Sequence, residues 1–185
     1  IFRLANNPID GYENVGMYWH SDGTFREDAT PISIFHLIAV PEQGGDTWFS
    51  RLRATLTSLP DDFRDEIDAL QTVHGNHVIH PLVNKHPVTG EKHIYLNVGL
   101  TAGILGISPK KTEEIINMIN AHMSLPENSY HHKWQPGDLI VADNFGVAHQ
   151  ARPVAKKQKR ILHRTTVSAK GVWWEKGDQT TSHAV

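Results

Sequence analysis

Short strand-forming segments separated by turn residues constrain the fold of this chain more than any other feature. The longest covers residues 32–40, is mostly apolar, and is bounded by Pro31 and Pro41. Helices do not alternate regularly with these segments, so a parallel sheet is not expected. The pattern predicts a mainly β fold with flanking helices, an antiparallel sandwich or barrel of the jelly-roll kind. The other predicted strands are residues 47–50, 77–83, 93–98, 138–143 and 161–168.

Two segments have the spacing of amphipathic helices. The first begins at Ser58, with Pro60 in its first turn. The second begins at Ser108 and Pro109 and ends before Pro126. Their apolar stripes are expected in the core rather than at a cofactor. These stripes are Leu59, Phe63, Ile67 and Leu70 in the first, and Ile115, Ile119 and either His122 or Met123 in the second.

Composition excludes several classes of function. The 185 residues suit a single domain, expected over residues 1–185. A net charge of −2 gives no electrostatic reason to bind nucleic acid or an anionic membrane, and no apolar run is long enough for a membrane helix. The absence of cysteine excludes disulfides, thiolate metal sites and cysteine nucleophiles, and it fits a cytoplasmic location.

Three side chains have the chemistry of a metal site. His20 and Asp22 are two residues apart, and His149 lies far downstream. Two imidazoles and one carboxylate are the set that binds non-haem Fe(II) on one face and leaves the opposite face open. If residues 20–22 form a strand, His20 and Asp22 point to the same side and can reach one ion. The alternative without a metal is a surface histidine beside an aspartate in a turn. The chain has 13 histidines, so such a pair can arise by chance.

The residues around these three side chains occur in a specific order. The ordered set resembles the TauD/TfdA family of Fe(II)/2-oxoglutarate-dependent dioxygenases, and the resemblance extends from about residue 19 to residue 167. It implies a double-stranded β-helix. The matching segments are WHSDGTF at 19–25, GGDT at 44–47, HPLV at 80–83, HPVTG at 86–90, PGDL at 136–139, and DN at 143–144 followed by His149, Arg160 and HR at 163–164.

The resemblance assigns roles to individual residues. It implies that His20, Asp22 and His149 bind Fe(II). It implies that Thr47 and Arg160 contact the distal carboxylate of 2-oxoglutarate. Thr47 follows Asp22 by 25 positions, and Arg160 follows His149 by 11. Arginine suits this role because its guanidinium is a planar fork that can bind a carboxylate through two hydrogen bonds.

Three further residues are candidates for contacts near the substrate. Arg164 faces the same side of a strand as Arg160, and in relatives it lies near the substrate or the iron-proximal end of 2-oxoglutarate. Gly23 follows the aspartate ligand, where relatives place the substrate and where a missing side chain leaves room. Asn7, upstream of the motif, is a candidate polar contact to substrate.

The reaction implied by the resemblance is an oxidation that needs Fe(II), 2-oxoglutarate and O2. 2-Oxoglutarate is converted to succinate and CO2, while a small polar metabolite is hydroxylated, desaturated or oxidatively cyclised. Arg164 brings anionic metabolites into the expected range. The alternative is a non-oxidative isomerase or hydrolase on a cupin-like barrel with the same ligands. Such an enzyme does not need Thr47 and Arg160 at these spacings.

The sequence also departs from the family. Residues 75–77 run directly into the next predicted strand, where relatives have a longer segment covering the active site. Either the lid of this enzyme is truly short, or a lid loop is missing from the sequence near residues 76–77. We expect the second, because lid loops are mobile. Ile1 is not methionine, so N-terminal residues are also expected to be missing. Family members often associate, which makes a homo-oligomer one expected state.

Overall fold

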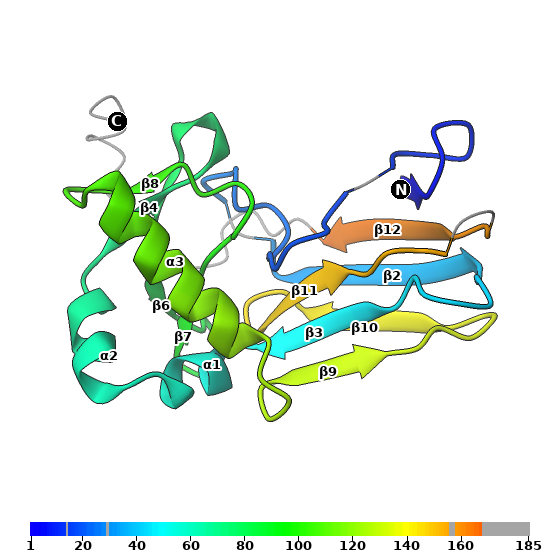
Figure 1. Ribbon diagram of the computed structural model, residues 1–185. Coiled ribbons are helices and arrows are strands. Elements are labelled where there is room, and N and C mark those ends of the chain that lie inside the picture. Colours follow the sequence, from blue (N-terminus) through cyan, green and yellow to red (C-terminus); the bar gives the residue numbers. More distant parts are fainter. Residues whose placement is uncertain (14, 29, 156–157, 168–185) are drawn as a thin grey trace.

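Two antiparallel sheets packed face to face form the larger part of the molecule (Figure 1). The structure is a computed structural model and describes residues 1–13, 15–28, 30–155 and 158–167. The four-stranded sheet has the order β1-β12-β2-β10, and the three-stranded sheet has the order β11-β3-β9. These strands are β1 (Phe2–Ala5), β2 (Ile32–Ala39), β3 (Thr47–Arg51), β9 (Ser129–His132), β10 (Leu139–Asp143), β11 (Val147–Ala151) and β12 (Ile161–Val167).

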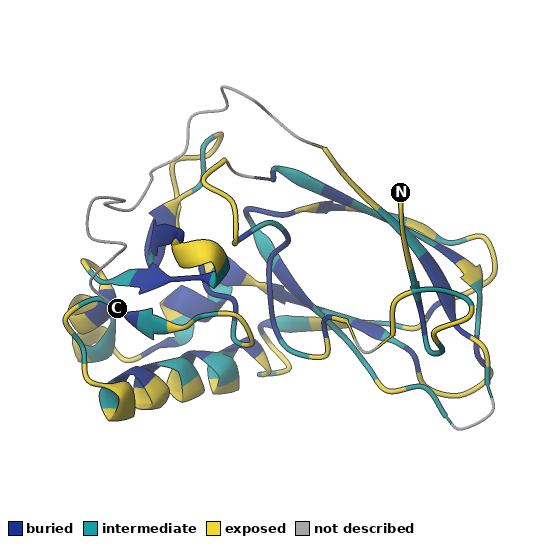
Figure 2. Ribbon diagram, turned by 90° about the horizontal axis from the view of Figure 1, so that it is seen from above, coloured by how far each residue is buried: buried dark blue, intermediate teal, exposed yellow. Residues whose placement is uncertain are grey.

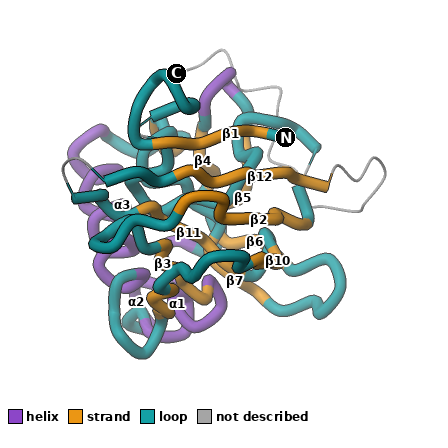
Figure 3. The backbone as a smooth tube through the Cα atoms, turned by 90° about the vertical axis from the view of Figure 1, so that its right-hand side faces the viewer, coloured by secondary structure: helices purple, strands orange, loops and turns teal. Residues whose placement is uncertain are grey.

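Strands distant in sequence are neighbours in both sheets. In Figure 3 the four-stranded sheet is seen with β12 between β1 and β2. Arg164 of β12 pairs with Phe35 of β2 and with Phe2 of β1, and His149 of β11 pairs with Phe49 of β3. These pairings bring residues near both ends of the chain beside residues 32–51.

Helices and short strands cover one end of the sandwich (Figure 1). Ser108 caps the long helix α3 by accepting a hydrogen bond from the Lys111 N–H at 3.3 Å. Thr112, Ile115, Ile119 and Met123 form its buried face. The elements of this part are α1 (Leu52–Ser58), α2 (Asp61–Ile67), β4 (Gln71–Val73), the 3-10 turn η1 (Gly75–His77), β5 (Ile79–Pro81), β6 (Val83–Lys85), β7 (Lys92–Ile94), β8 (Gly103–Ile104) and α3 (Pro109–Met123).

The buried apolar side chains form two main clusters. Figure 2 shows buried residues in dark blue both in the strands of the two sheets and in the part that contains the helices. One cluster lies between the sheets and includes Phe35, Phe49 and Leu162. The other lies under the helices and extends to Trp19. Trp19 is 1% exposed and donates its indole N–H to Ser124 Oγ at 2.9 Å. The chain segment before His20 is therefore anchored in the helical core.

Removing buried volume from α3 is expected to destabilise the fold. Ile119 is fully buried in the helical core, so Ile119→Ala is expected to lower the free energy of unfolding by about 2–5 kcal/mol. Met118 of the same helix is 40% exposed, and Met118→Ala is the matched control with an expected change below about 0.5 kcal/mol. Urea denaturation of both variants measures the difference. Equal losses would contradict this packing.

The predicted strands at 32–40, 138–143 and 161–168 match β2, β10 and β12. The segment 77–83 is not one strand, because η1 and the break at Leu82 divide it. The predicted helix from Ser58 begins only at Asp61, since Pro60 has extended backbone (φ −55°, ψ 147°) and precedes α2. The second helix is confirmed as α3, and Met123 rather than His122 completes its buried stripe.

Residues at the proposed site of a missing loop form the turn η1. Asn76 and His77 have φ angles of 62° and 60°, a left-handed conformation that is uncommon for residues other than glycine. The single domain over residues 1–185 stays a prediction, and residues 168–185 lie outside the described part. Among the described residues, no helix has the length and apolar character needed to cross a bilayer.

Candidate metal centre

Backbone pairing brings the two predicted histidine ligands together. His20 donates its N–H to the His149 carbonyl at 3.0 Å, and His149 donates to the His20 carbonyl at 2.8 Å. Residues directly opposite in an antiparallel pair direct their side chains to the same face. The two imidazole rings accordingly lie with their centroids 4.2 Å apart.

Asp22 reaches the same point from a turn. The prediction that residues 20–22 form a strand is wrong, because only His20 makes a β-bridge and Asp22 lies in a turn. The Asp22 carboxylate lies 4.0 Å from His20 Nε2 through Oδ1 and 3.8 Å from His149 Nε2 through Oδ2. The turn therefore brings the Asp22 carboxylate close to both histidines, as we expected from a strand.

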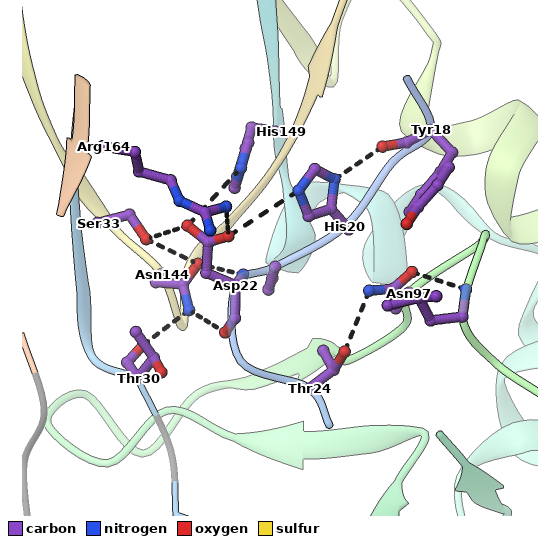
Figure 4. Close-up of polar contacts among 12 residues, drawn as sticks. Tyr18, His20, Asp22, Thr24, Thr30, Ser33, Asn97, Asn144, His149 and Arg164 are labelled. Atoms are coloured by element: carbon purple, nitrogen blue, oxygen red, sulfur yellow. Dashed lines mark hydrogen bonds and ion pairs between the residues drawn. The ribbon is translucent and has the colours of Figure 1, made fainter. Parts of the chain in front are cut away.

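The spacing of the three donors suits one metal ion (Figure 4). One ligand atom from each of His20, Asp22 and His149 lies within 4.8 Å of the others, and all three residues are buried. Donors about 2.0–2.2 Å from a single ion are up to about 4.4 Å apart, so small side-chain adjustments suffice. The His20 Nδ1–H donates to the Tyr18 carbonyl at 2.8 Å, which leaves the Nε2 lone pair facing the site.

The site favours the protonation states that bind metal. Burial lowers the pKa of His149 to about 3 and also lowers the pKa of His20. Burial acts to raise the pKa of Asp22, but His149, Arg164, His20 and the Ser33 hydroxyl outweigh it and hold the pKa below its usual value. At neutral pH the site therefore presents two neutral imidazoles and one carboxylate, the set expected for non-haem Fe(II).

Side chains from two strands of the large sheet hold the Asp22 carboxylate. Ser33 of β2 donates its hydroxyl to Asp22 Oδ2 at 2.6 Å. Arg164 of β12 donates from Nη1 to Asp22 Oδ1. Arg164 also lies over the Phe2 ring, with 5.2 Å between Cζ and the ring centroid. Arg164 therefore contacts the proposed metal ligand Asp22 and also lines the cavity next to it.

Thr47 and Arg160 form a second polar group. Thr47 Oγ1 accepts hydrogen bonds from Trp134 Nε1 at 3.0 Å and from Arg160 Nη2 at 3.2 Å. A hydroxyl has two acceptor positions and one donor, so these bonds leave the Thr47 O–H free to donate. Arg160 Nε donates to the Gly45 carbonyl at 2.8 Å. The two hydrogen bonds that Arg160 donates, to Thr47 and to Gly45, together fix the plane of its guanidinium group.

Arg160 is a buried cation that forms no ion pair among the described residues, although the Asp46 carboxylate acts to raise its pKa. It is 6% exposed, and no described carboxylate forms an ion pair with it. Burial lowers the pKa of Arg160 to about 10, so the side chain stays charged at neutral pH. A buried charge is costly unless it is paired, and the free N–H groups of Arg160 are suited to an anionic ligand.

Two cavities meet at the metal site. A narrow one extends from His20 and His149 to Thr47 and Arg160. A wider one, of about 460 Å³, is lined by His20 and Asp22. Arg164 lines both cavities. The wider cavity is also lined by Phe2, Tyr18, Thr24, Phe25, Asn97 and Leu100.

Gly23 lies at the wider cavity, whereas Asn7 does not. Gly23 lines the wider cavity, but a Cβ there would lie 2.3 Å from Thr30 Oγ1, and its φ is +81°. Backbone conformation and the contact with Thr30 therefore explain the glycine. Asn7 lines neither cavity: its Oδ1 accepts from the N–H groups of Ile9 and Asp10, and it caps a loop. The substrate contact by Asn7 stays a prediction that neither cavity supports.

Several residues support the site in ways that the sequence did not predict. Asn6 Oδ1, rather than Asn7, accepts the Arg160 backbone N–H at 2.8 Å. Trp134 fixes Thr47, and Asn144 and Ser33 hold Asp22 and its turn. Asn144 follows Asp143 in a segment that the family resemblance singles out, so it had a sequence signal. Trp134 had none.

The family profile described as "Taurine catabolism dioxygenase TauD, TfdA family" matches residues 3–166, nearly the whole described chain. The chain belongs to this family. The mainly β fold with flanking helices, a double-stranded β-helix, is thereby confirmed, since structures of the family share it. Within the TauD/TfdA family, the His-Asp-His site at one end of the two sheets agrees with the predicted Fe(II) cofactor.

One similar protein is named as an alpha-ketoglutarate dioxygenase. A Sphingobium herbicidovorans (S)-phenoxypropionate/alpha-ketoglutarate-dioxygenase is 28% identical over 82% of this chain and 62% of its own length. Pentalenolactone F synthase of Streptomyces arenae is 26% identical over 87% of this chain and 67% of its own. The structure of AAD-2 in complex with Mn(II) and N-oxalylglycine superposes with a TM-score of 0.78 at 27% identity, covering 85% of this chain and 69% of that chain. This chain therefore spans about 60–70% of the length of these relatives.

Proposed function

We propose that this chain is the core of an Fe(II)/2-oxoglutarate-dependent dioxygenase. It oxidises a small polar metabolite by hydroxylation, desaturation or oxidative cyclisation, and it converts 2-oxoglutarate and O2 to succinate and CO2. Family membership and the names of the relatives support the reaction class. His20, Asp22 and His149 are the proposed Fe(II) ligands.

The buried, unpaired guanidinium of Arg160 carries this proposal. It shares a narrow cavity with the two histidine ligands, and the Thr47 hydroxyl lies beside it as a further donor. A dicarboxylate that reaches from the metal to Arg160 compensates the buried charge and fills the cavity. A non-oxidative metal enzyme uses the same three ligands but gives no reason for a buried arginine and threonine at this position. The cosubstrate contacts are therefore assigned to Thr47 and Arg160.

Each group of the site has a defined task in this reaction. Bound Fe(II) supplies the activation of O2 that couples the loss of CO2 from 2-oxoglutarate to substrate oxidation. Arg160 and Thr47 orient the cosubstrate through its distal carboxylate. Trp134 keeps the Thr47 hydroxyl pointed toward that carboxylate, because its indole N–H occupies an acceptor position. The walls of the wider cavity hold the substrate beside the metal and exclude water.

The test of the proposed function starts from metal-free protein that is reconstituted anaerobically with Fe(II) and 2-oxoglutarate and then exposed to O2. The measured quantity is the succinate formed. We expect succinate only when both Fe(II) and 2-oxoglutarate are present. A metabolite screen by mass spectrometry is read for products that gain one oxygen atom or lose two hydrogen atoms. Substrate turnover by the metal-free protein, or turnover that does not consume 2-oxoglutarate, would reject the mechanism and favour the non-oxidative alternative.

The wider cavity favours a substrate with an anionic group and an apolar body. Arg164 supplies a cation next to Asp22, while Phe2, Phe25 and Leu100 supply apolar walls. Phenoxypropionate, named for one relative, has this combination of groups. We therefore propose small carboxylates, sulfonates or similar anions as the first compounds to screen.

Arg164→Met is expected to raise the KM for an anionic substrate by about 10- to 100-fold, because a charge-assisted hydrogen bond contributes about 1.5–3 kcal/mol. The KM for 2-oxoglutarate is expected to rise less than the substrate KM, because Arg164 lines the narrow cavity too but Arg160 is the proposed partner of the distal carboxylate. Steady-state kinetics with each compound varied in turn measures both values. Arg53, an exposed residue paired with Glu91 at 3.2 Å, provides the matched control Arg53→Met. An unchanged substrate KM in Arg164→Met would remove Arg164 from the substrate contacts.

The missing lid also stays a proposal, supported by two observations. The alignment with pentalenolactone F synthase extends over 199 positions, more than the 185 residues of this chain, so that relative carries inserted residues. The turn at 75–77 lies beside the wider cavity, since a Cβ on Gly75 would lie 3.8 Å from Phe25 Cβ. We propose the insertion at this turn. A homo-oligomer and a cytoplasmic location also remain predictions.

A further inference from the structure

The side chain of Asn144 binds the backbone of the turn that carries Asp22 (Figure 4). Its Oδ1 accepts the Asp22 N–H at 2.8 Å, and its Nδ2 donates to the Asp22 carbonyl at 2.9 Å. Nδ2 also donates to the Thr30 carbonyl at 2.7 Å. Asn144 is 2% exposed, so these bonds are shielded from water.

These bonds take the place of strand pairing. Asp22 lies in a turn outside the named strands, yet it is 5% exposed and its buried backbone groups need partners. One primary amide offers an acceptor and two donors in a single plane, and Asn144 uses all three. The bond to Thr30 also fixes the far end of the loop that begins at Asp22, directly before β2.

The backbone of Asn144 connects the same turn to the third ligand. The Asn144 N–H donates to the Pro31 carbonyl at 2.9 Å. Five residues later, His149 of β11 completes the triad through its backbone pair with His20. Asn144 therefore links two of the proposed metal ligands. It is hydrogen-bonded to the segment that carries Asp22, and it precedes His149 by five residues in the chain.

We infer that Asn144 is a positioning residue of the metal centre. By holding both backbone polar groups of Asp22, its amide fixes the carboxylate at the distance from His20 and His149 that one ion requires. Ser33 then sets the orientation of the carboxylate by donating to Oδ2. This inference rests on the proposed function, because it assumes that the triad binds a divalent metal.

The substitution Asn144→Asp isolates this role. Aspartate has the same size and can still accept the Asp22 N–H. It cannot donate, so it replaces two hydrogen bonds with a carboxylate oxygen facing the Asp22 and Thr30 carbonyls. Asn128 provides the matched control. It is 3% exposed and donates Nδ2 to Ser58 Oγ at 2.8 Å and to the His122 carbonyl at 2.9 Å, among the helices.

The experiment measures anaerobic Mn(II) binding to full-length wild type, Asn144→Asp and Asn128→Asp by calorimetric titration. Loss of a residue that orients a metal ligand costs about 10- to 100-fold in metal affinity. We expect this loss for Asn144→Asp and an unchanged dissociation constant for Asn128→Asp, although both variants lose thermal stability. If Asn144→Asp does not fold, Asn144→Ala, which adds no repulsive oxygen, is titrated in its place with the same expected loss.

The outcomes separate the two proposals. Wild type that binds no Mn(II) would contradict the proposed function. Wild type that binds Mn(II) with an affinity equal to that of Asn144→Asp would overturn the inference about Asn144 alone. Equal weakening in Asn144→Asp and Asn128→Asp would also overturn it, since the effect would then follow from general destabilisation.

Discussion

His149→Ala is expected to lower iron- and 2-oxoglutarate-dependent succinate formation by about 1,000-fold or more. The substitution removes one of three donors from a buried site that offers no other histidine, aspartate or glutamate donor among the described residues. A metal ion contributes several kcal/mol to catalysis, and about 4 kcal/mol corresponds to about 1,000-fold in rate. Succinate release per minute, measured at saturating 2-oxoglutarate, gives the value.

His131→Ala is the control for that prediction. His131 is exposed and stacks on Trp48 with 3.7 Å between ring centroids, so it is a histidine outside the metal site. We expect this variant to keep the wild-type rate and metal affinity. A His149→Ala enzyme that retains more than about a tenth of the wild-type rate would show that His149 does not bind the catalytic metal.

Arg160→Met is expected to raise the KM for 2-oxoglutarate by about 30-fold to several thousand-fold. Truncating one partner of a buried, hydrogen-bonded charge pair costs about 2–5 kcal/mol. Arg160→Lys keeps the charge but lacks the planar fork, so an intermediate KM is expected. Kinetics at varied 2-oxoglutarate and fixed substrate measures the series. The buried Arg160 in the narrow cavity is the reason for the large effect.

Metal affinity distinguishes this effect from general damage to the site. Arg160 contacts Gly45 and Thr47 rather than the metal ligands, so Mn(II) binding to Arg160→Met is expected to match wild type. Arg53→Met again serves as the exposed arginine control. A wild-type KM for 2-oxoglutarate in Arg160→Met would assign the cosubstrate to another partner and leave the buried cation without an explanation.

The sequence predicts the strands that have strong apolar patterns. β2 and β10 combine alternating burial with proline or turn residues next to their ends, and β12 begins with two buried apolar residues, Ile161 and Leu162. β9 is built from Ser129, Tyr130, His131 and His132, which are polar or aromatic and exposed or only partly buried, so hydrophobic periodicity does not identify it. The helix α1 begins at Leu52, and its N-cap residue Arg51 makes no side-chain capping bond, which removes the usual signal of a helix start.

The sequence predicts the three metal-ligand candidates, but the backbone geometry that brings them together differs from the predicted strand. Strand periodicity placed His20 and Asp22 on one face, whereas the structure uses a backbone pair with His149 and a turn held by Asn144. Long-range hydrogen bonds such as Trp134 to Thr47 join residues 87 positions apart and leave no local pattern in the sequence. The family resemblance supplied the roles of Thr47 and Arg160, which spacing alone does not.

The central claim is that one metal ion and one 2-oxoglutarate bind together between the His-Asp-His site and Arg160. Anaerobic titration of the Fe(II)-loaded protein with 2-oxoglutarate, followed by visible absorbance, tests it most directly. We predict a band that requires both components, saturates at one 2-oxoglutarate per protein, and disappears in His149→Ala. A protein that binds Fe(II) but develops no such band at saturating 2-oxoglutarate would contradict the claim.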